Sequence, residues 1–288
     1  MSQILDGKKV AQKLKDGLKI EIGNIKSKFN RVPGLAVVQV GNVAASSVYV
    51  RAKTKAAKEV GINVFDHHLE VTTNQYDLIN LIGRLNSNSD IDGILVQLPL
   101  PKTINEELVL NSIVPEKDAD GFHPLNVGKL AISPKNDKNL MIPCTPYGCL
   151  LLLKELDIKL AGKNAVVIGR SNIVGKPMAQ LLLKESCTVT TVHSKTINIE
   201  NICKKADILI AAIGKPEFVN KDWVKEGAII IDVGINRIKI NEEKSKLVGD
   251  VLFSDVEHKV SAISPVPGGV GPMTIACLLR NTTIAFKK

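Results

Sequence analysis

The chain has 288 residues, of which 44% are hydrophobic, and a formal net charge of +9 at pH 7. That length suffices for two folded domains, and that hydrophobic content excludes an intrinsically disordered chain. No stretch approaches the roughly 18 apolar residues of a membrane-spanning helix, and the first ten residues, MSQILDGKKV, contain no apolar signal segment. We therefore expect a cytoplasmic protein with no membrane partner; a mitochondrial form whose targeting segment has been removed stays open.

The charge and the cysteines narrow the class further. Lysines are scattered along the whole chain and only 3% of residues are aromatic, so few surfaces exist on which bases could stack, and dispersed solvated charge is favoured over nucleic-acid binding. The five cysteines are odd in number and include no CxxC pair, which predicts reduced thiols rather than a disulfide framework or a zinc site.

Short apolar runs alternate with helical patterns along the chain. Strands buried on both faces are predicted at 35–40, 92–98, 164–169, 188–192, 207–214 and 227–234, and helices at 44–60, 74–86, 146–156, 175–185 and from about Pro272 onward. This order predicts an α/β fold with mainly parallel sheets. The polar, proline-punctuated segment 131–146 indicates a boundary between two domains.

The helix 44–60 carries a run of basic residues. At 100° per residue, four apolar side chains form a stripe that should pack on the sheet: Val48, Ala52, Ala56 and Val60. Tyr49 falls inside this stripe and Lys53 just beyond its edge, whereas three basic side chains cluster on the opposite, solvated side: Arg51, Lys55 and Lys58. Lys53 is either a snorkelling lysine or, with its pKa lowered by lost hydration, a proton-transfer group.

Two later segments favour the chemical interpretation of Lys53. Gln97 stands at the carboxyl end of a predicted strand, where ligands gather in open α/β sheets. The loop VPEKDADGFHP then presents Glu116, Asp118 and Asp120, which form either a solvated acidic turn or a carboxylate aimed at paired N–H donors of a substrate. No metal-ligand pattern accompanies these carboxylates, and we expect no metal.

Residues 162–180 predict a dinucleotide site. A buried strand ends at Gly169 and a helix follows Gly175, so backbone N–H groups at the start of the helix face the turn, as in pyrophosphate sites. No acidic residue follows the next strand, which ends instead in Ser194 and Lys195. With Arg170 in the turn, this pattern favours NADP over NAD, the alternative being that Arg170 and Lys195 are merely exposed.

The loop PVPGGVGP, residues 265–272, holds three prolines and three glycines before the last helix. Such a loop mixes fixed φ angles with positions open to positive φ. It is either a passive linker or a rigid loop beside a ligand, and the residues leave both open.

Taken together, the motifs resemble the bifunctional methylenetetrahydrofolate dehydrogenase/cyclohydrolase family. The matching segments occur in the family's order: VYVRAKTKAAKEVGI, DGILVQLPLP, PEKDADGFHPLNVGKL, PCTPYG, GRSNIVGKPMA, VHSKT, GAIIIDVGINR and PVPGGVGPMTIACLLRNT. The chain departs from the pattern at VGNVAASS and at Ala119, where valine is expected. Both departures lie outside the proposed chemical groups and put local packing in doubt more than activity.

The resemblance implies a homodimer that oxidises 5,10-methylenetetrahydrofolate with NADP and hydrolyses the methenyl product. It implies an N-terminal catalytic domain of residues 1–139, rejoined by 271–288, and a Rossmann-like NADP-binding domain of residues 140–270. Its partners would be the folate substrate and a second copy of itself, with no nucleic acid.

The resemblance also implies a role for each matching residue. Lys53 would be the central catalytic group, Gln97 would tune it, and Tyr49 would shape the pocket and stack near the folate. Asp120 would bind the pterin ring, with Pro267 and Gly268 near the substrate. The cofactor would contact Gly169, Arg170, Ser171, Ser194 and Ile235.

Two other classes remain as alternatives. An NADP-dependent oxidoreductase similar to shikimate dehydrogenase would share the architecture without requiring Tyr49, Lys53, Gln97 and Asp120 together, and fold alone does not separate such enzymes. A basic nucleic-acid-binding protein would show salt-dependent binding. The sequence does not reveal the balance of the two activities, the dimer contacts or the polyglutamate preference.

Overall fold

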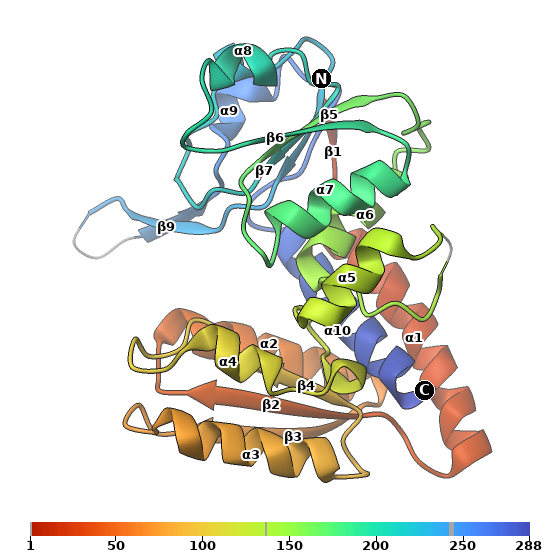
Figure 1. Ribbon diagram of the computed structural model, residues 1–288. Helices are drawn as coiled ribbons and strands as arrows, with labels where there is room; N and C mark the ends of the chain where they lie inside the picture. The colour runs from red at the N-terminus through yellow and green to blue at the C-terminus, as the bar shows by residue number, and fades with distance from the viewer. Residues whose placement is uncertain (1, 136, 242–244) are drawn as a thin grey trace. The chain divides into compact units, whose positions relative to one another are not determined.

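A computed structural model describes residues 2–135, 137–241 and 245–288 (Figure 1). The chain divides into two compact units. Unit 1 comprises Met1–Ala11 and Thr145–Thr274, and unit 2 comprises Gln12–Cys144 and Ile275–Lys288. The chain passes from one unit to the other within helices α1 (Gly7–Phe29) and α10 (Val270–Phe286) and at the start of α6 (Cys144–Lys154). Each unit therefore combines segments that are far apart in the sequence.

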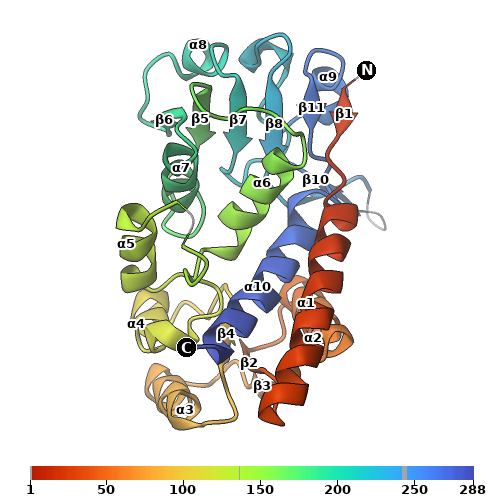
Figure 2. The ribbon, with the colours of Figure 1, turned by 90° about the vertical axis from the view of Figure 1, so that its right-hand side faces the viewer.

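Unit 2 is built on a three-stranded parallel sheet in the order β3-β2-β4. The strands are β2 (Gly34–Val40), β3 (Asn63–Leu69) and β4 (Gly93–Val96), and the helices are α2 (Ala44–Val60), α3 (Gln75–Ser87), α4 (Glu106–Asn111) and α5 (Pro124–Ile132), with a short 3₁₀ turn at Pro115–Lys117. Apolar residues of α3 and α4 share a buried cluster with one face of the sheet, and α2 lies on the other face (Figure 2). The central strand β2 is buried along its whole length, as a parallel strand covered on both faces should be.

Unit 1 contains a six-stranded parallel sheet in the order β1-β11-β8-β7-β5-β6 (Figure 2). Its strands are β1 (Gln3–Ile4), β5 (Asn164–Ile168), β6 (Thr188–Val192), β7 (Ile208–Ala211), β8 (Ile229–Asp232) and β11 (Ala262–Ile263). An antiparallel pair, β9 (Asn236–Lys239) and β10 (Ser245–Val248), stands apart from it, and the remaining helices are α7 (Gly175–Lys184), α8 (Ile199–Cys203) and α9 (Phe253–Val256), with a 3₁₀ turn at Lys221–Trp223.

The strand order of unit 1 locates a ligand-binding edge. Strand β5 is followed in sequence by β6 on one side and by β7 on the other side of the sheet, so the direction of winding reverses at β5. In open parallel sheets, ligands bind beyond the carboxyl ends of the strands at such a reversal. The turns after β5 and β7 are therefore the expected ligand loops of this unit.

The structure confirms the predicted α/β class with mainly parallel sheets. Each of the six predicted strands and five predicted helices has a counterpart in the fold. The prediction that β6 is buried on both faces is wrong: Thr188 and Thr191 are exposed, because β6 is the last strand of its sheet. Within the residues described, no helix has the length and apolarity needed to span a membrane.

Candidate active site

Helix α2 places Lys53 in the middle of its buried face. The predicted apolar stripe is wrong in its first half, because Val48 is 54% exposed and Ala52 is exposed. The buried side chains of the helix are instead Ser46, Val50, Lys53, Ala56, Ala57 and Val60. A buried lysine is tolerated only where its ammonium has a hydrogen-bonding partner, and apolar spacing alone carries no information about that partner.

The partner of Lys53 is Gln97, directly after β4. Lys53 Nζ donates to Gln97 Oε1 at 3.1 Å, and Lys53 is only 6% exposed. Gln97 Nε2 donates to the Leu98 carbonyl at 2.6 Å, and a carbonyl can only accept. The Gln97 amide is thereby oriented with its oxygen toward Lys53, which fixes the ammonium at the carboxyl edge of the sheet.

Tyr49 lies one helical turn before Lys53. Its side chain is partly buried, and this burial raises the pKa of the phenol. The hydroxyl is therefore neutral at physiological pH and can donate or accept a hydrogen bond.

Two of the three carboxylates of the acidic loop, Asp118 and Asp120, are buried, whereas Glu116 is exposed. The interpretation of this loop as a solvated turn is therefore wrong for the two aspartates. Asp118, 2% exposed, accepts hydrogen bonds from Gly121 N at 3.0 Å, His123 N at 2.8 Å and Asn126 Nδ2 at 2.9 Å. These bonds engage both Asp118 oxygens and hold the loop in shape. Asp118 is thus structural, although in the sequence it was indistinguishable from its neighbour.

Asp120 differs from Asp118 in having an unpartnered carboxylate. It is 8% exposed and accepts no side-chain hydrogen bond within the part of the chain that the structure describes. Burial raises its pKa to about 6, an effect that the nearby positive charge of Lys53 opposes and the charge of Asp118 reinforces. A buried carboxylate with two vacant acceptor oxygens is suited to a ligand that presents paired N–H donors.

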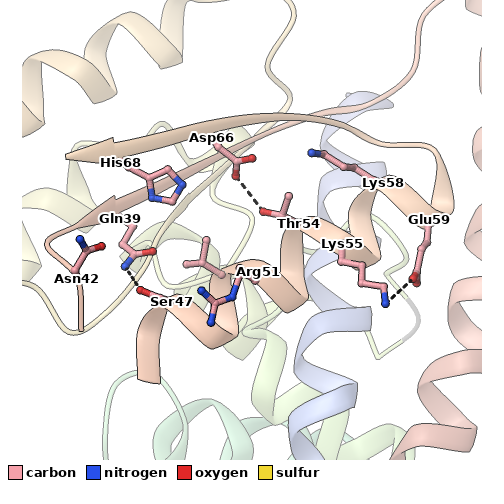
Figure 3. Close-up of a pocket in the computed structure, with 11 residues that line it drawn as sticks. Gln39, Asn42, Ser47, Arg51, Thr54, Lys55, Lys58, Glu59, Asp66 and His68 are labelled. Carbon is pink, nitrogen blue, oxygen red and sulfur yellow. Dashed lines mark hydrogen bonds and ion pairs between the residues drawn. The ribbon is translucent and has the colours of Figure 1, made fainter. Parts of the chain in front are cut away.

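The opposite flank of α2 carries the rest of the basic run (Figure 3). Here a groove of about 760 Å³ is bordered by exposed side chains, including Arg51, Lys55 and Lys58. Lys55 lies 4.0 Å from Glu59, and such exposed pairs contribute little to stability. The predicted division of the run into a solvated face and one separate lysine is confirmed.

In unit 1, the turn after β5 is shaped by two glycines. Gly169 has φ +120°, and a Cβ on it would lie 2.2 Å from the Ala212 carbonyl oxygen after β7. A Cβ on Gly175 would lie 2.3 Å from the Gly169 carbonyl oxygen. Because neither position has room for a side chain, the turn packs closely against the neighbouring backbone.

The predicted cofactor residues lie along the same sheet edge. Ser171 Oγ accepts from Val174 N at 3.1 Å and Gly175 N at 3.3 Å, at the start of α7. Arg170 is exposed in the turn, and Ser194 is exposed just beyond β6. Strands β5 and β6 are parallel neighbours, so the structure brings Arg170 and Ser194 to one edge.

Two buried aspartates that sequence analysis missed organise the neighbouring loops. Asp232, at the end of β8, accepts from the backbone N–H groups of Gly234, Asp250 and Val251 at 2.9–3.0 Å. Asp250, fully buried, accepts from Ile213 N, Gly214 N and Asn236 Nδ2 at 2.7–3.0 Å. Burial raises the pKa of Asp232 to about 7, against the effect of its N–H donors.

These carboxylates replace missing backbone partners in the loops after β7 and β8. Ile235 is 43% exposed. Its two neighbours are hydrogen-bonded to the aspartates, Gly234 to Asp232 and Asn236 to Asp250, so the residues on both sides of Ile235 are held in place. The sequence signals this network only through a glycine near each aspartate, Gly234 two residues after Asp232 and Gly249 directly before Asp250. In the fold each glycine packs against the other aspartate: a Cβ on Gly249 would meet Asp232 Oδ2 at 1.7 Å, and one on Gly234 would meet Asp250 Oδ1 at 2.3 Å.

Pro267 and Gly268 lie in a tight turn before α10. Gly268 has φ +109°, and the next residue, Gly269, donates its N–H to the Pro265 carbonyl at 2.9 Å. A Cβ on Gly7 would lie 1.7 Å from the Gly269 carbonyl oxygen. The loop is therefore closely packed rather than a loose linker.

The described residues contain no cluster of three or more histidine, cysteine or acidic side chains able to hold a metal ion. The five predicted cofactor residues belong to unit 1, whereas Lys53, Gln97 and Asp120 belong to unit 2.

Comparison with known proteins gives a consistent result. Residues 5–120 match the model of the tetrahydrofolate dehydrogenase/cyclohydrolase catalytic domain, and residues 143–288 match that of the NAD(P)-binding domain of the same family. The chain is 52% identical over 288 residues to the bifunctional protein FolD of Rhodospirillum rubrum, covering 99% of this chain and 97% of the relative. It is 54% identical over 286 residues to FolD of Acetivibrio thermocellus, with the same coverage.

Solved structures agree. The bifunctional FolD enzyme of Campylobacter jejuni superposes with a TM-score of 0.94 at 47% identity, covering 100% of this chain and 99% of the other. FolD of Trypanosoma brucei, complexed with NADP and an inhibitor, gives a TM-score of 0.93 at 38% identity, covering 99% and 97%. Shikimate dehydrogenase of Aquifex aeolicus gives 0.51 at 15% identity over 88% and 91%, a similarity of fold alone.

Fold, loops and matches define the class as an α/β enzyme with an NAD(P)-binding domain. Within that class, both domain models of one family match this chain, and about half of its residues are identical to those of the FolD relatives. The chain belongs to the tetrahydrofolate dehydrogenase/cyclohydrolase family.

Proposed function

We propose that the chain oxidises 5,10-methylenetetrahydrofolate with NADP and hydrolyses the resulting 5,10-methenyltetrahydrofolate to 10-formyltetrahydrofolate. The family membership supports both activities. The observation that carries the proposal to this chain's own residues is the buried Lys53–Gln97 pair, whose positive charge acts on the unpartnered carboxylate of Asp120. A shikimate-type enzyme would not require this set of three.

Unit 1 holds the cofactor in this proposal. Bound NADP supplies the hydride acceptor. Gly169 and Ser171 shape the turn that receives the pyrophosphate, and Ile235 lies in the loop that would border the nicotinamide. Arg170 and Ser194 bind the 2′-phosphate, which no carboxylate near Ser194 repels.

Unit 2 holds the folate and performs the hydrolysis. Asp120 accepts two hydrogen bonds from the pterin ring, and Tyr49 offers its ring for stacking. Lys53 transfers protons as water adds to the methenyl carbon and the ring nitrogen leaves, either directly or through a water molecule. Gln97 keeps the Lys53 ammonium in place through the 3.1 Å hydrogen bond. Pro267 and Gly268 are assigned to the substrate by the family resemblance alone.

We further propose a cytoplasmic homodimer with no nucleic-acid partner. The dispersed lysines and the low aromatic content support the absence of nucleic-acid binding. The family resemblance supports self-association. Sedimentation velocity in 50 and 500 mM salt, with and without a short duplex DNA, tests both: a monomer, or co-sedimentation with DNA at the lower salt, contradicts the proposal.

The decisive experiment follows both reactions in the same samples. NADPH formation is measured from methylenetetrahydrofolate with NADP and separately with NAD, while methenyl and 10-formyl products are quantified. NADPH together with 10-formyl product is expected. Reduction without methenyl hydrolysis would remove the proposed role of Lys53, and no reduction by a folded, NADP-binding protein would refute the function, leaving shikimate as the next substrate to test.

A further inference from the structure

The backbone that carries Asp120 is held without any contribution from the Asp120 carboxylate, which makes no hydrogen bond among the described residues. Here the two peptide groups on either side of the residue are both hydrogen-bonded. The Ala119 carbonyl accepts from Asn281 Nδ2 at 2.9 Å, and the Asp120 carbonyl accepts from Cys144 N at 3.2 Å.

Asn281 connects these two supports. It lies in α10, is fully buried, and donates from the same Nδ2 to the Ile142 carbonyl at 2.8 Å. Ile142 lies two residues before Cys144, whose N–H donates to the Asp120 carbonyl. The Asn281 amide therefore holds both the residue before Asp120 and the segment that contacts Asp120 from the other side. Its own oxygen accepts from Arg280 Nη1 at 3.1 Å. The amide nitrogen donates and the amide oxygen accepts, which fixes the orientation of the amide.

The backbone around Asp120 packs tightly against the backbone of Ile142 and Pro143. Gly121 has φ +75°, and a Cβ on it would lie 2.6 Å from the Ile142 carbonyl carbon and the Pro143 nitrogen. Asp118 closes the other side of the loop through its bonds to Gly121 N and His123 N. The backbone on either side of Asp120 is thus fixed by groups that never touch its carboxylate.

We propose that Asn281 is a positioning residue for the folate site: it fixes the backbone that carries Asp120 and leaves both carboxylate oxygens free for the ligand. The inference rests on the proposed function, in which Asp120 binds the pterin ring. Small displacements of a positioned group reduce binding steeply. Loss of the Asn281 hydrogen bonds to the Ala119 and Ile142 carbonyls is therefore expected to weaken folate binding without changing dinucleotide binding in unit 1.

The test compares Asn281→Ser, which keeps one donor, and Asn281→Leu, which keeps none, with Thr283→Val as a matched control. Thr283 lies in the same helix, is 1% exposed, and donates to the Leu279 carbonyl within that helix. Binding of tetrahydrofolate and of NADP is measured by calorimetry, with thermal unfolding as a check on folding. Asn281→Ser should raise the tetrahydrofolate Kd by about tenfold, Asn281→Leu by more, and neither should change the NADP Kd beyond twofold.

A double-mutant cycle separates positioning from general destabilisation. If Asn281 acts through Asp120, then Asn281→Ser should have little further effect on tetrahydrofolate binding in an Asp120→Asn background. The inference is overturned if Asn281→Ser weakens tetrahydrofolate binding equally in the unsubstituted and the Asp120→Asn backgrounds. It is also overturned if Asn281→Ser changes the tetrahydrofolate Kd no more than Thr283→Val does. If Asn281→Leu fails to fold, the cycle built on Asn281→Ser decides alone. Failure of the unsubstituted enzyme to bind tetrahydrofolate would instead refute the proposed function and this inference with it.

Discussion

Folate binding should follow the ionisation of Asp120. Burial raises its pKa to about 6, and only the ionised form offers both oxygens as acceptors to the paired N–H groups of the pterin ring that we propose as its ligand. A carboxyl group with a pKa of about 6 is half ionised at pH 6, so binding is strongest above this pH and weakens progressively below it. Roughly nine-tenths of the Asp120 carboxyl groups are ionised at pH 7 and roughly one-tenth at pH 5. The tetrahydrofolate Kd should therefore be about tenfold higher at pH 5 than at pH 7.

The assay is calorimetric titration with tetrahydrofolate at half-unit steps from pH 5 to pH 8, in buffers of matched ionic strength. Asp120→Asn is the control, because any remaining pH dependence in that variant belongs to the ligand. Lys53→Met should move the midpoint upward, since the Lys53 charge lowers the Asp120 pKa. A flat profile in the unsubstituted enzyme, or an unchanged profile in Asp120→Asn, would refute the reasoning.

Four further changes have defined outcomes. Lys53→Ala should reduce cyclohydrolase turnover by roughly 100-fold or more while leaving NADP affinity unchanged; retained turnover contradicts the assignment. Arg170→Ala should lower the NADP-to-NAD ratio of kcat/KM by about tenfold through loss of a charge-assisted bond, and an unaltered ratio excludes it from 2′-phosphate binding. Asp250→Ala leaves three donors unpaired and should lower the free energy of unfolding by about 3 kcal/mol in urea denaturation. Asp120→Asn should raise the free energy of unfolding at pH 7.5 by up to about 3 kcal/mol. The Asp120 pKa is raised from the ordinary 3.8 to about 6 in the folded state, so the unsubstituted protein loses stability as pH rises between these two values.

The apolar strands were predictable because their side chains are buried on both faces, which gives continuous runs such as β7 and β8. Strand β3 was missed because it lies at a sheet edge and alternates between exposed and half-buried residues, including two histidines. Helix α1 was missed because its buried residues form one narrow stripe among lysines: Ala11, Leu18, Ile22 and Ile25.

The site was only partly predictable for a related reason. Lys53 and Gln97 stand on separate elements that motif and strand-end rules locate one at a time. Asp250 and Asn281 act on backbone groups distant in sequence, as in the separation of 162 residues between Asn281 and Ala119. Such contacts leave no periodic pattern, so only the folded chain reveals them.

The way the chain passes between its units affects how it is made. Unit 2 takes buried residues, including Leu278 and Asn281, from the end of the chain, and unit 1 takes β1 from its beginning, paired with β11. During synthesis, the sheet of unit 2 emerges from the ribosome long before the helix that completes its core. Residues Thr145–Thr274 of unit 1 must therefore be translated before the core of unit 2 can be completed. During this period unit 2 exposes apolar surface, and we expect a chaperone to have its greatest effect on the yield of folded protein then.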